Sequence, residues 1–195
     1  MLNKKMVVPI VIALLAAFGV NFDKLGIDVD SLLGGDGQTV AGSDSAGNQS
    51  TSNVGGYQSG KHWSNSTPAI NLRHVFEGEI NRKGKPVGFH SRPGGVDPVT
   101  ARLVRIQDKP NRAGIYTATI EVKDGGQWKQ KFSSFFPDSM SPTDVEQSIH
   151  NAYRNSSNPK KQPWKGPSGH GFDVQGYTLS RGDINTAFPV YRKDR

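Results

Sequence analysis

Apolar and polar residues alternate along much of the second half of the chain, with the period of two that is typical of β-strands. The clearest alternation covers 114–123, in which every even position from 116 to 122 is apolar. An Asp-Gly-Gly turn follows and predicts a hairpin into a strand over 127–136. A further strand is predicted over 99–107, so these three segments are expected to form an antiparallel sheet.

The same strand signal recurs near the C-terminus. It covers 172–180 and 184–191, and the Arg-Gly-Asp between these segments predicts a turn. A short strand is also predicted over 86–90, after a Gly-Lys-Pro turn. The segment 155–171 is rich in Pro, Gly and Lys and is predicted to be a loop, in which Trp164 either packs on the core or stacks on a nucleic-acid base.

Helical spacing appears in two places. The Ser-Thr-Pro at 66–68 is a helix-start signal, and Leu72, Val75 and Phe76 then lie on one helical face. A second helix is predicted to open at 141–144, where an acidic residue favours the N-terminus of a helix. Together these elements predict an α+β fold of antiparallel β-sheets with a few helices.

The N-terminal third of the chain differs in composition from the rest. Two lysines precede an uncharged apolar run over 6–20, the layout of a signal peptide, so we assign 1–22 to a signal peptide or a membrane anchor. The segment 23–66 is rich in Gly, Ser and Asn and is predicted to be a flexible linker. A globular domain is predicted over 67–195. The protein is therefore expected to be exported, and to be periplasmic, secreted or tethered to the membrane.

Positive charge is concentrated in the predicted domain. The 195-residue chain has a net charge of +7, yet 1–66 contains four Lys and five Asp, so the surplus lies in 67–195. Such a distribution favours a polyanionic partner or an anionic membrane surface. The chain has no cysteine, which excludes disulfides and thiolate zinc sites.

Two histidines stand 16 residues apart among glycines and basic residues, at His74 and His90. Histidine titrates near neutral pH, so such a pair can provide the base and the acid for RNA cleavage without a metal, with Lys131 as the cation. The five histidines show no His-x-x-x-His or His-Glu-x-x-His spacing, so no metal site is predicted. A Gly-x-Ser-x-Gly nucleophile motif is also missing from the sequence.

Four segments resemble the EndoU family of endoribonucleases, most closely its bacterial branch, which often forms the toxic C-terminal domain of polymorphic and contact-dependent toxins. They are Arg-His-Val-Phe-Glu-Gly-Glu-Ile at 73–80, Gly-Phe-His at 88–90, Ser-Ser-Phe-Phe-Pro at 133–137 and Thr-Ala-Phe-Pro at 186–189. The resemblance covers about 68–191 and implies a fold distantly similar to that of pancreatic ribonuclease. It also implies cleavage of single-stranded RNA, preferentially at uridines, to give 2′,3′-cyclic phosphate ends.

The resemblance also implies roles for individual residues. His90 matches the family base, His74 the acid and Lys131 the catalytic lysine, with Lys129 as the alternative. A hydroxyl that contacts uracil is expected at Ser133 or Ser134. No bound cofactor is expected, although some family members respond to manganese.

The last motif matches the family less completely. Thr186 matches a Ser or Thr of the family, but Phe188 stands where many members have an aromatic residue with a hydroxyl. Stacking on uracil is retained, whereas a hydrogen bond from that position is lost, and Tyr191 is the nearby candidate to replace it.

The expected function is thus an exported or membrane-tethered endoribonuclease, with single-stranded RNA as its substrate and a toxin role that would require a cognate immunity protein. The alternative is a noncatalytic module of the same fold that binds RNA, another polyanion or a component of the cell envelope.

Overall fold

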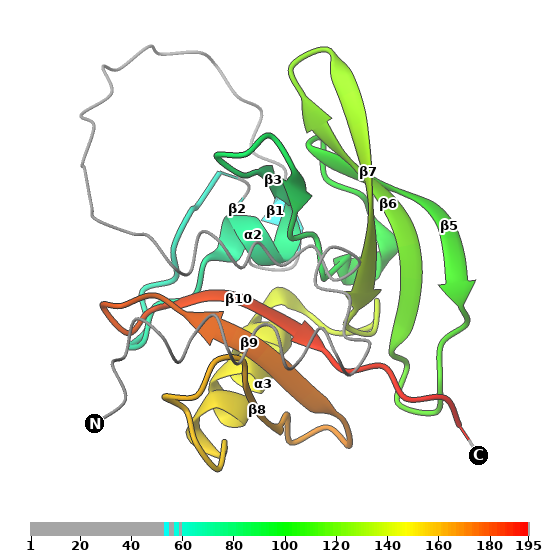
Figure 1. Cartoon of the computed structure of the whole chain (residues 1–195). Helices are drawn as coiled ribbons and strands as arrows, with labels where there is room; N and C mark the ends of the chain where they lie inside the picture. Colours follow the sequence, from blue (N-terminus) through cyan, green and yellow to red (C-terminus); the bar gives the residue numbers. More distant parts are fainter. Residues whose placement is uncertain (1–52, 55–56, 59, 195) are drawn as a thin grey trace, which may run out of the picture.

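The computed structural model describes residues 53–54, 57–58 and 60–194 (Figure 1). The leader predicted over 1–22 lies outside these residues, as does most of the linker predicted over 23–66. The described part has the predicted α+β class, with antiparallel sheets and two α-helices among its residues. In that part of the chain, no helix combines the length and the apolarity needed to cross a bilayer.

The first three-stranded sheet is the one that the alternating pattern predicts. Its strands pair in the order β5-β6-β7 and span Ala101–Asp108, Tyr116–Asp124 and Gln127–Phe135. The apolar face of β6 is buried and packs with Phe89 and Phe135 into one of two hydrophobic clusters. The strand predicted over 114–123, together with its two faces, is therefore confirmed.

The second three-stranded sheet has the order β10-β9-β8, with strands at Ile184–Pro189, Asp173–Thr178 and Trp164–Pro167. Helix α3 (Pro142–Arg154) covers it and joins the second hydrophobic cluster. β10 contacts both β7 and the helix that carries His74, so it lies where the two halves of the domain meet (Figure 1).

Strand β8 corrects the loop predicted over 155–171. A glycine and a proline in this segment lower the strand signal of the sequence. However, β8 is at the edge of its sheet, where proline is tolerated. The first residue of β8, Trp164, is only 1% exposed and its ring packs edge-on against Tyr153 at 5.3 Å. Of the two roles considered for this tryptophan, the structure shows core packing.

Short elements complete the described part of the chain. They are helix α2 (Leu72–Phe76), the antiparallel pair β3 (Glu79–Ile80) and β4 (Pro86–Val87), the 3-10 helix η1 (Pro93–Gly95), and the antiparallel pair β1 (Asn53–Val54) and β2 (Tyr57–Gln58). Residues 60–66 lie in the predicted linker, yet they contact this region. The backbone N–H of Ile70 donates to Ser64 Oγ, and that of Leu72 donates to the carbonyl of His62.

Two boundaries near the histidines differ from the predictions. The helix expected to start at 66–68 begins at Leu72, because the Asn71 side chain caps it, whereas Thr67–Pro68 is a cis peptide within a bend. The strand expected over 86–90 ends at Val87. The next residue is a glycine with a φ of 75°, and Phe89 has a φ of 59°, which breaks the extended conformation.

Candidate active site

Helix α2 fixes the position of His74. The Asn71 side chain accepts a hydrogen bond from the His74 backbone N–H at 3.1 Å, which satisfies a free donor in the first turn. Leu72, Val75 and Phe76 bury their side chains in the core, as their helical spacing predicts. His74 is itself only 6% exposed, so a polar side chain that lies off the apolar face is still enclosed by its neighbours.

A left-handed turn places His90 beside this helix. Gly88 passes so close to it that a Cβ atom at this position would lie 2.2 Å from the His74 carbonyl oxygen. The turn then allows the N–H of Phe89 to donate to His74 O and the N–H of His90 to donate to Val75 O, both at 2.7 Å. Only glycine permits this approach, which explains the glycine that precedes the Phe-His pair.

The two imidazole rings lie together as the sequence predicts. Their centroids are 5.8 Å apart, with an angle of 30° between the ring planes. The ring of Phe188 lies 5.3 Å from that of His90, on the side of β10. The structure thus joins α2 and the turn after β4 in one cluster with β10, which lies about a hundred residues later in the sequence.

The surroundings of His90 determine which of its nitrogens carries the proton. Its Nδ1 lies 3.1 Å from the carbonyl oxygen of Ser134, which can only accept, so Nδ1 is the protonated nitrogen and Nε2 is free to accept a proton. Ser133 Oγ donates to the Phe89 carbonyl at 2.7 Å and lies 2.9 Å from the same Nδ1. Burial lowers the pKa of His90 well below its usual value, and the charges of Lys131 and His74 lower it further.

His74 has a different partner. Its Nδ1 donates to Glu79 Oε1 at 2.9 Å, and the same carboxylate oxygen accepts from the Asn71 amide at 3.4 Å. Burial by itself raises the pKa of Glu79, but the hydrogen bond and the charge of His74 outweigh it, so the net pKa is lowered. Glu79 is therefore an anion that orients His74 and neutralises its charge when the imidazole is protonated.

Of the two candidate lysines, Lys131 lies nearer the histidines. Its Nζ donates to the Gly88 carbonyl at 2.8 Å, and burial lowers its pKa to about 7. Lys129 instead donates to the Gly84 carbonyl and pairs with Asp124 at 2.6 Å. Both lysines lie on the face of β7 that carries Ser133, but only Lys131 reaches the turn that bears His90.

This geometry can be set beside known proteins. The model of the family described as "Bacterial EndoU nuclease" matches residues 69–191. The chain belongs to this family. A protein named "Toxin" from Bacillus cereus (strain ATCC 14579) is 32% identical to the chain over 125 residues, which is 61% of this chain but only 22% of that protein. No solved structure gives a significant match.

The family match covers the histidine pair, β7 and the whole of β10. Within this EndoU domain, Thr186 and Phe188 are both buried on the face of β10 that turns toward His90. The hydroxyl of Ser134 is buried without a hydrogen-bond partner among the described residues. Tyr191 does not join the cluster, because its hydroxyl donates to the Lys109 carbonyl at 3.4 Å and none of its described contacts involves a histidine.

Two residues of the candidate site were missed from the sequence. Glu79 lies inside the first motif, yet that motif contains two glutamates and its letters do not show which one reaches His74. Tyr177 pairs directly with Thr186 across β9 and β10, so the two side chains share one face. Its hydroxyl is buried without a partner in the described part of the chain, and burial raises its pKa.

The described residues contain no group of three or more His, Asp or Glu side chains arranged to hold a metal ion. His62 lies against the start of α2, where its carbonyl accepts from the Leu72 N–H at 2.8 Å, and His150 and His170 lie in other parts of the domain. His150 bonds to Ser66 Oγ at 2.8 Å, and His170 stacks on Phe172 with their centroids 6.4 Å apart.

Proposed function

We propose that the chain is an endoribonuclease that cleaves single-stranded RNA through attack of a 2′-hydroxyl on the adjacent phosphate. One observation carries the proposal, namely two imidazoles 5.8 Å apart with opposite surroundings. His90 has a free Nε2, and its depressed pKa leaves the ring unprotonated at neutral pH, the state in which it can act as a base. His74 is backed by a carboxylate, which suits an acid.

The proton transfers balance as follows. His90 Nε2 takes the proton of the 2′-hydroxyl while the 2′-oxygen bonds to phosphorus. The bond from phosphorus to the 5′-oxygen breaks, and protonated His74 gives its proton to that oxygen. The products are a 2′,3′-cyclic phosphate and a 5′-hydroxyl, and the reaction needs no oxidant, water or metal ion.

Lys131 supplies positive charge near the phosphorane. A side chain with a pKa of about 7 is charged in roughly half of the molecules at neutral pH. Its hydrogen bond to the Gly88 carbonyl holds the ammonium beside the turn that carries His90. A cation fixed in a buried site stabilises developing charge more strongly than one in water.

A preference for uridine is proposed on the resemblance to EndoU proteins and on the contacts of β10. The ring of Phe188 packs beside His90 with only 4% of the residue exposed, and the hydroxyl of Thr186 lies on the same face. Ser133 is already bonded to His90 and to the Phe89 carbonyl, so we assign it first to holding the base in place.

The family and the relative named "Toxin" support a toxin role, with a cognate immunity protein as the partner. Export, with release or membrane attachment through residues 1–22, is proposed from the sequence alone. The proposed reaction needs no cofactor, and manganese is an addition to be tested.

The experiment is to incubate the full chain with a uridine-containing oligonucleotide in EDTA and to identify the ends by mass spectrometry. We expect a 2′,3′-cyclic phosphate and a 5′-hydroxyl next to uridine. His90→Ala should stop cleavage while the oligonucleotide still binds. An oligonucleotide left intact, with and without added manganese, would show that the domain is a noncatalytic binding module.

A further inference from the structure

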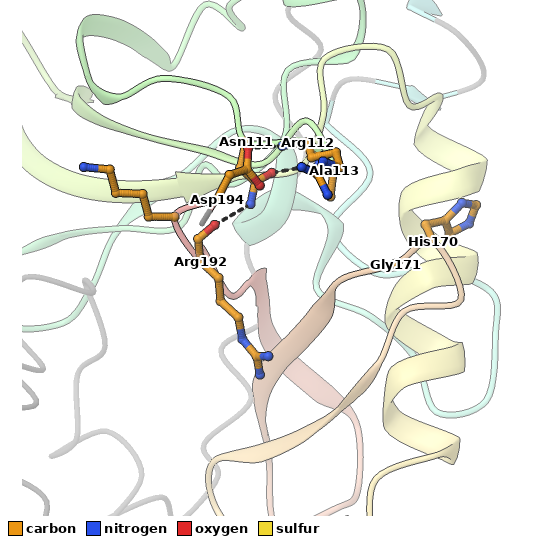
Figure 2. Close-up of a pocket in the computed structure, with 8 residues that line it drawn as sticks. Asn111, Arg112, Ala113, His170, Gly171, Arg192 and Asp194 are labelled. Carbon is orange, nitrogen blue, oxygen red and sulfur yellow. Dashed lines mark hydrogen bonds between the residues drawn. The ribbon is translucent and has the colours of Figure 1, made fainter.

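A pocket of about 460 Å³ opens where the segment after β10 meets the turn before β6 (Figure 2). Two hydrogen bonds join its walls. Asn111 Nδ2 donates to the Arg192 carbonyl at 2.8 Å, and the backbone N–H of Arg112 donates to Asp194 Oδ2 at 2.7 Å. These are the dashed lines in Figure 2. The pocket is therefore held open by the fold itself.

The lining of this pocket carries more positive than negative charge. The lining includes Arg112, Arg192 and Lys193 but a single carboxylate, Asp194, which already accepts from the Arg112 backbone N–H. Arg192 is bound to Asp173 at 2.6 Å. The other two cations are exposed and form no ion pair with any residue that the structure describes. They are free to meet an anion from outside the chain.

Two of the segments that line the pocket lead along the chain to residues that contact His90. On one side, Phe188 contacts the His90 ring and Arg192 follows four residues later, which spans at most about 14 Å of extended chain. On the other, Gly114 packs against Pro137, and Phe136 before it donates its N–H to the His90 carbonyl at 2.9 Å.

We propose that this pocket binds a backbone phosphate of the RNA, a few nucleotides from the bond that is cut. The inference rests on the proposed ribonuclease function. The volume is within the range of sites for small ligands, so a phosphate and part of its nucleoside fit. Because β10 leads directly from the histidines to the pocket, an RNA strand is a better occupant than a separate acidic protein.

The test compares Arg112→Gln/Lys193→Gln with Lys160→Gln/Lys161→Gln, a matched change at two exposed lysines elsewhere. Each protein is assayed on a uridine dinucleotide and on an oligonucleotide of ~10 nucleotides. For the pocket variant we expect a KM about 3- to 10-fold higher on the long substrate, with kcat and dinucleotide cleavage unchanged. The slope of log KM against log salt should fall by about 0.7, the value for one phosphate on a single strand.

Equal losses on both substrates, or a control variant that loses as much, would overturn the pocket assignment. So would an unchanged KM on the long substrate, which would leave a protein partner as the occupant. If the wild-type chain cleaves neither substrate, the proposed function fails, and anisotropy binding of the long oligonucleotide decides the pocket separately. Weaker binding by the pocket variant, but not by the control variant, supports the pocket assignment. Binding equal to that of the wild-type chain refutes it.

Discussion

The surroundings of the two histidines differ although both rings are buried. His74 shares its Nδ1 proton with the carboxylate of Glu79, whereas His90 gives its Nδ1 proton to a neutral carbonyl and a hydroxyl. A positive Lys131 lies near His90 and opposes a second positive charge there. The imidazole of His74 thus lies against an anion, whereas that of His90 lies near a cation and neutral acceptors, which suits the two different roles proposed for them.

The largest effects should come from the histidines. His74→Ala and His90→Ala should each lower kcat on RNA by about 10²- to 10⁴-fold, while His150→Ala, the control, should change it little. A substrate with a 4-nitrophenolate leaving group needs no acid, so it should restore the rate of His74→Ala but not that of His90→Ala. Restoration of His90→Ala instead would reverse the two assignments.

Lys131→Met should lower kcat by about 10²-fold, because it removes the charge that stabilises the phosphorane. The acidic limb of the pH–rate profile should also move to higher pH, since burial still depresses the pKa of His90 but the Lys131 charge no longer does. Lys129→Met is the matched control. A larger loss for Lys129→Met than for Lys131→Met would reassign the catalytic lysine.

The same variant should be more stable than wild type at and below pH 7, by about 1–3 kcal/mol. Burial lowers the pKa of Lys131 from the ordinary 10.5 to about 7, so the unfolded chain binds more protons than the folded one between these values. Wild-type stability therefore rises with pH in that window, and the advantage of Lys131→Met should fade toward pH 10.5. Denaturant titrations at several pH values measure this difference in the free energy of unfolding. A Lys131→Met variant less stable than wild type at pH 7 would contradict the prediction.

Glu79→Gln keeps the shape of the side chain but removes the anion behind His74. We expect kcat on RNA to fall by about 10- to 100-fold, the loss typical of a hydrogen bond to a charged group. Cleavage of the 4-nitrophenyl substrate should be nearly unchanged, because the acid is not used. Equal losses on the two substrates would mean that Glu79 supports the fold rather than His74, and Glu121→Gln controls for the lost charge.

The smallest effect is expected at β7. Ser133→Ala removes one acceptor of the His90 Nδ1 proton but leaves the Ser134 carbonyl, so kcat should fall by only about 5- to 10-fold. Ser134→Ala should be near neutral, because that hydroxyl has no partner among the described residues. A larger loss for Ser134→Ala would show that the second serine contacts the substrate.

The contrast between the strands explains how much of the fold could be predicted. β6 alternates apolar and polar residues because one of its faces is buried, and this pattern can be read directly, whereas β7 is indicated by the Asp-Gly-Gly turn before it. β8 has only four residues, including a glycine and a proline, so its pairing with β9 depends on tertiary contacts. The start of α2 was also misplaced, since a proline signal at 66–68 competed with the true cap at Asn71.

Some residues of the candidate site could likewise be predicted from the sequence and others could not. The motifs identified His74 and His90, and the structure brings them together. Glu79 was missed because its contact depends on the turn at Gly78, whose φ of 68° directs the chain back toward the helix. Tyr177 lies outside every motif, and only its register opposite Thr186 shows that it faces the site.

The sheet that contains β10 also separates two tasks. The base, the cation and the serine that holds the base belong to the turn after β4 and to β7, whereas Thr186, Phe188 and Tyr177 belong to the hairpin of β9 and β10. Under the proposed function, mutations in that hairpin are expected to change which nucleotide is accepted, except at Phe188, whose ring packs on His90 and whose loss would also disturb the base. On that proposal a lineage could alter the sequences that it cuts, through one hairpin, without rebuilding the chemistry.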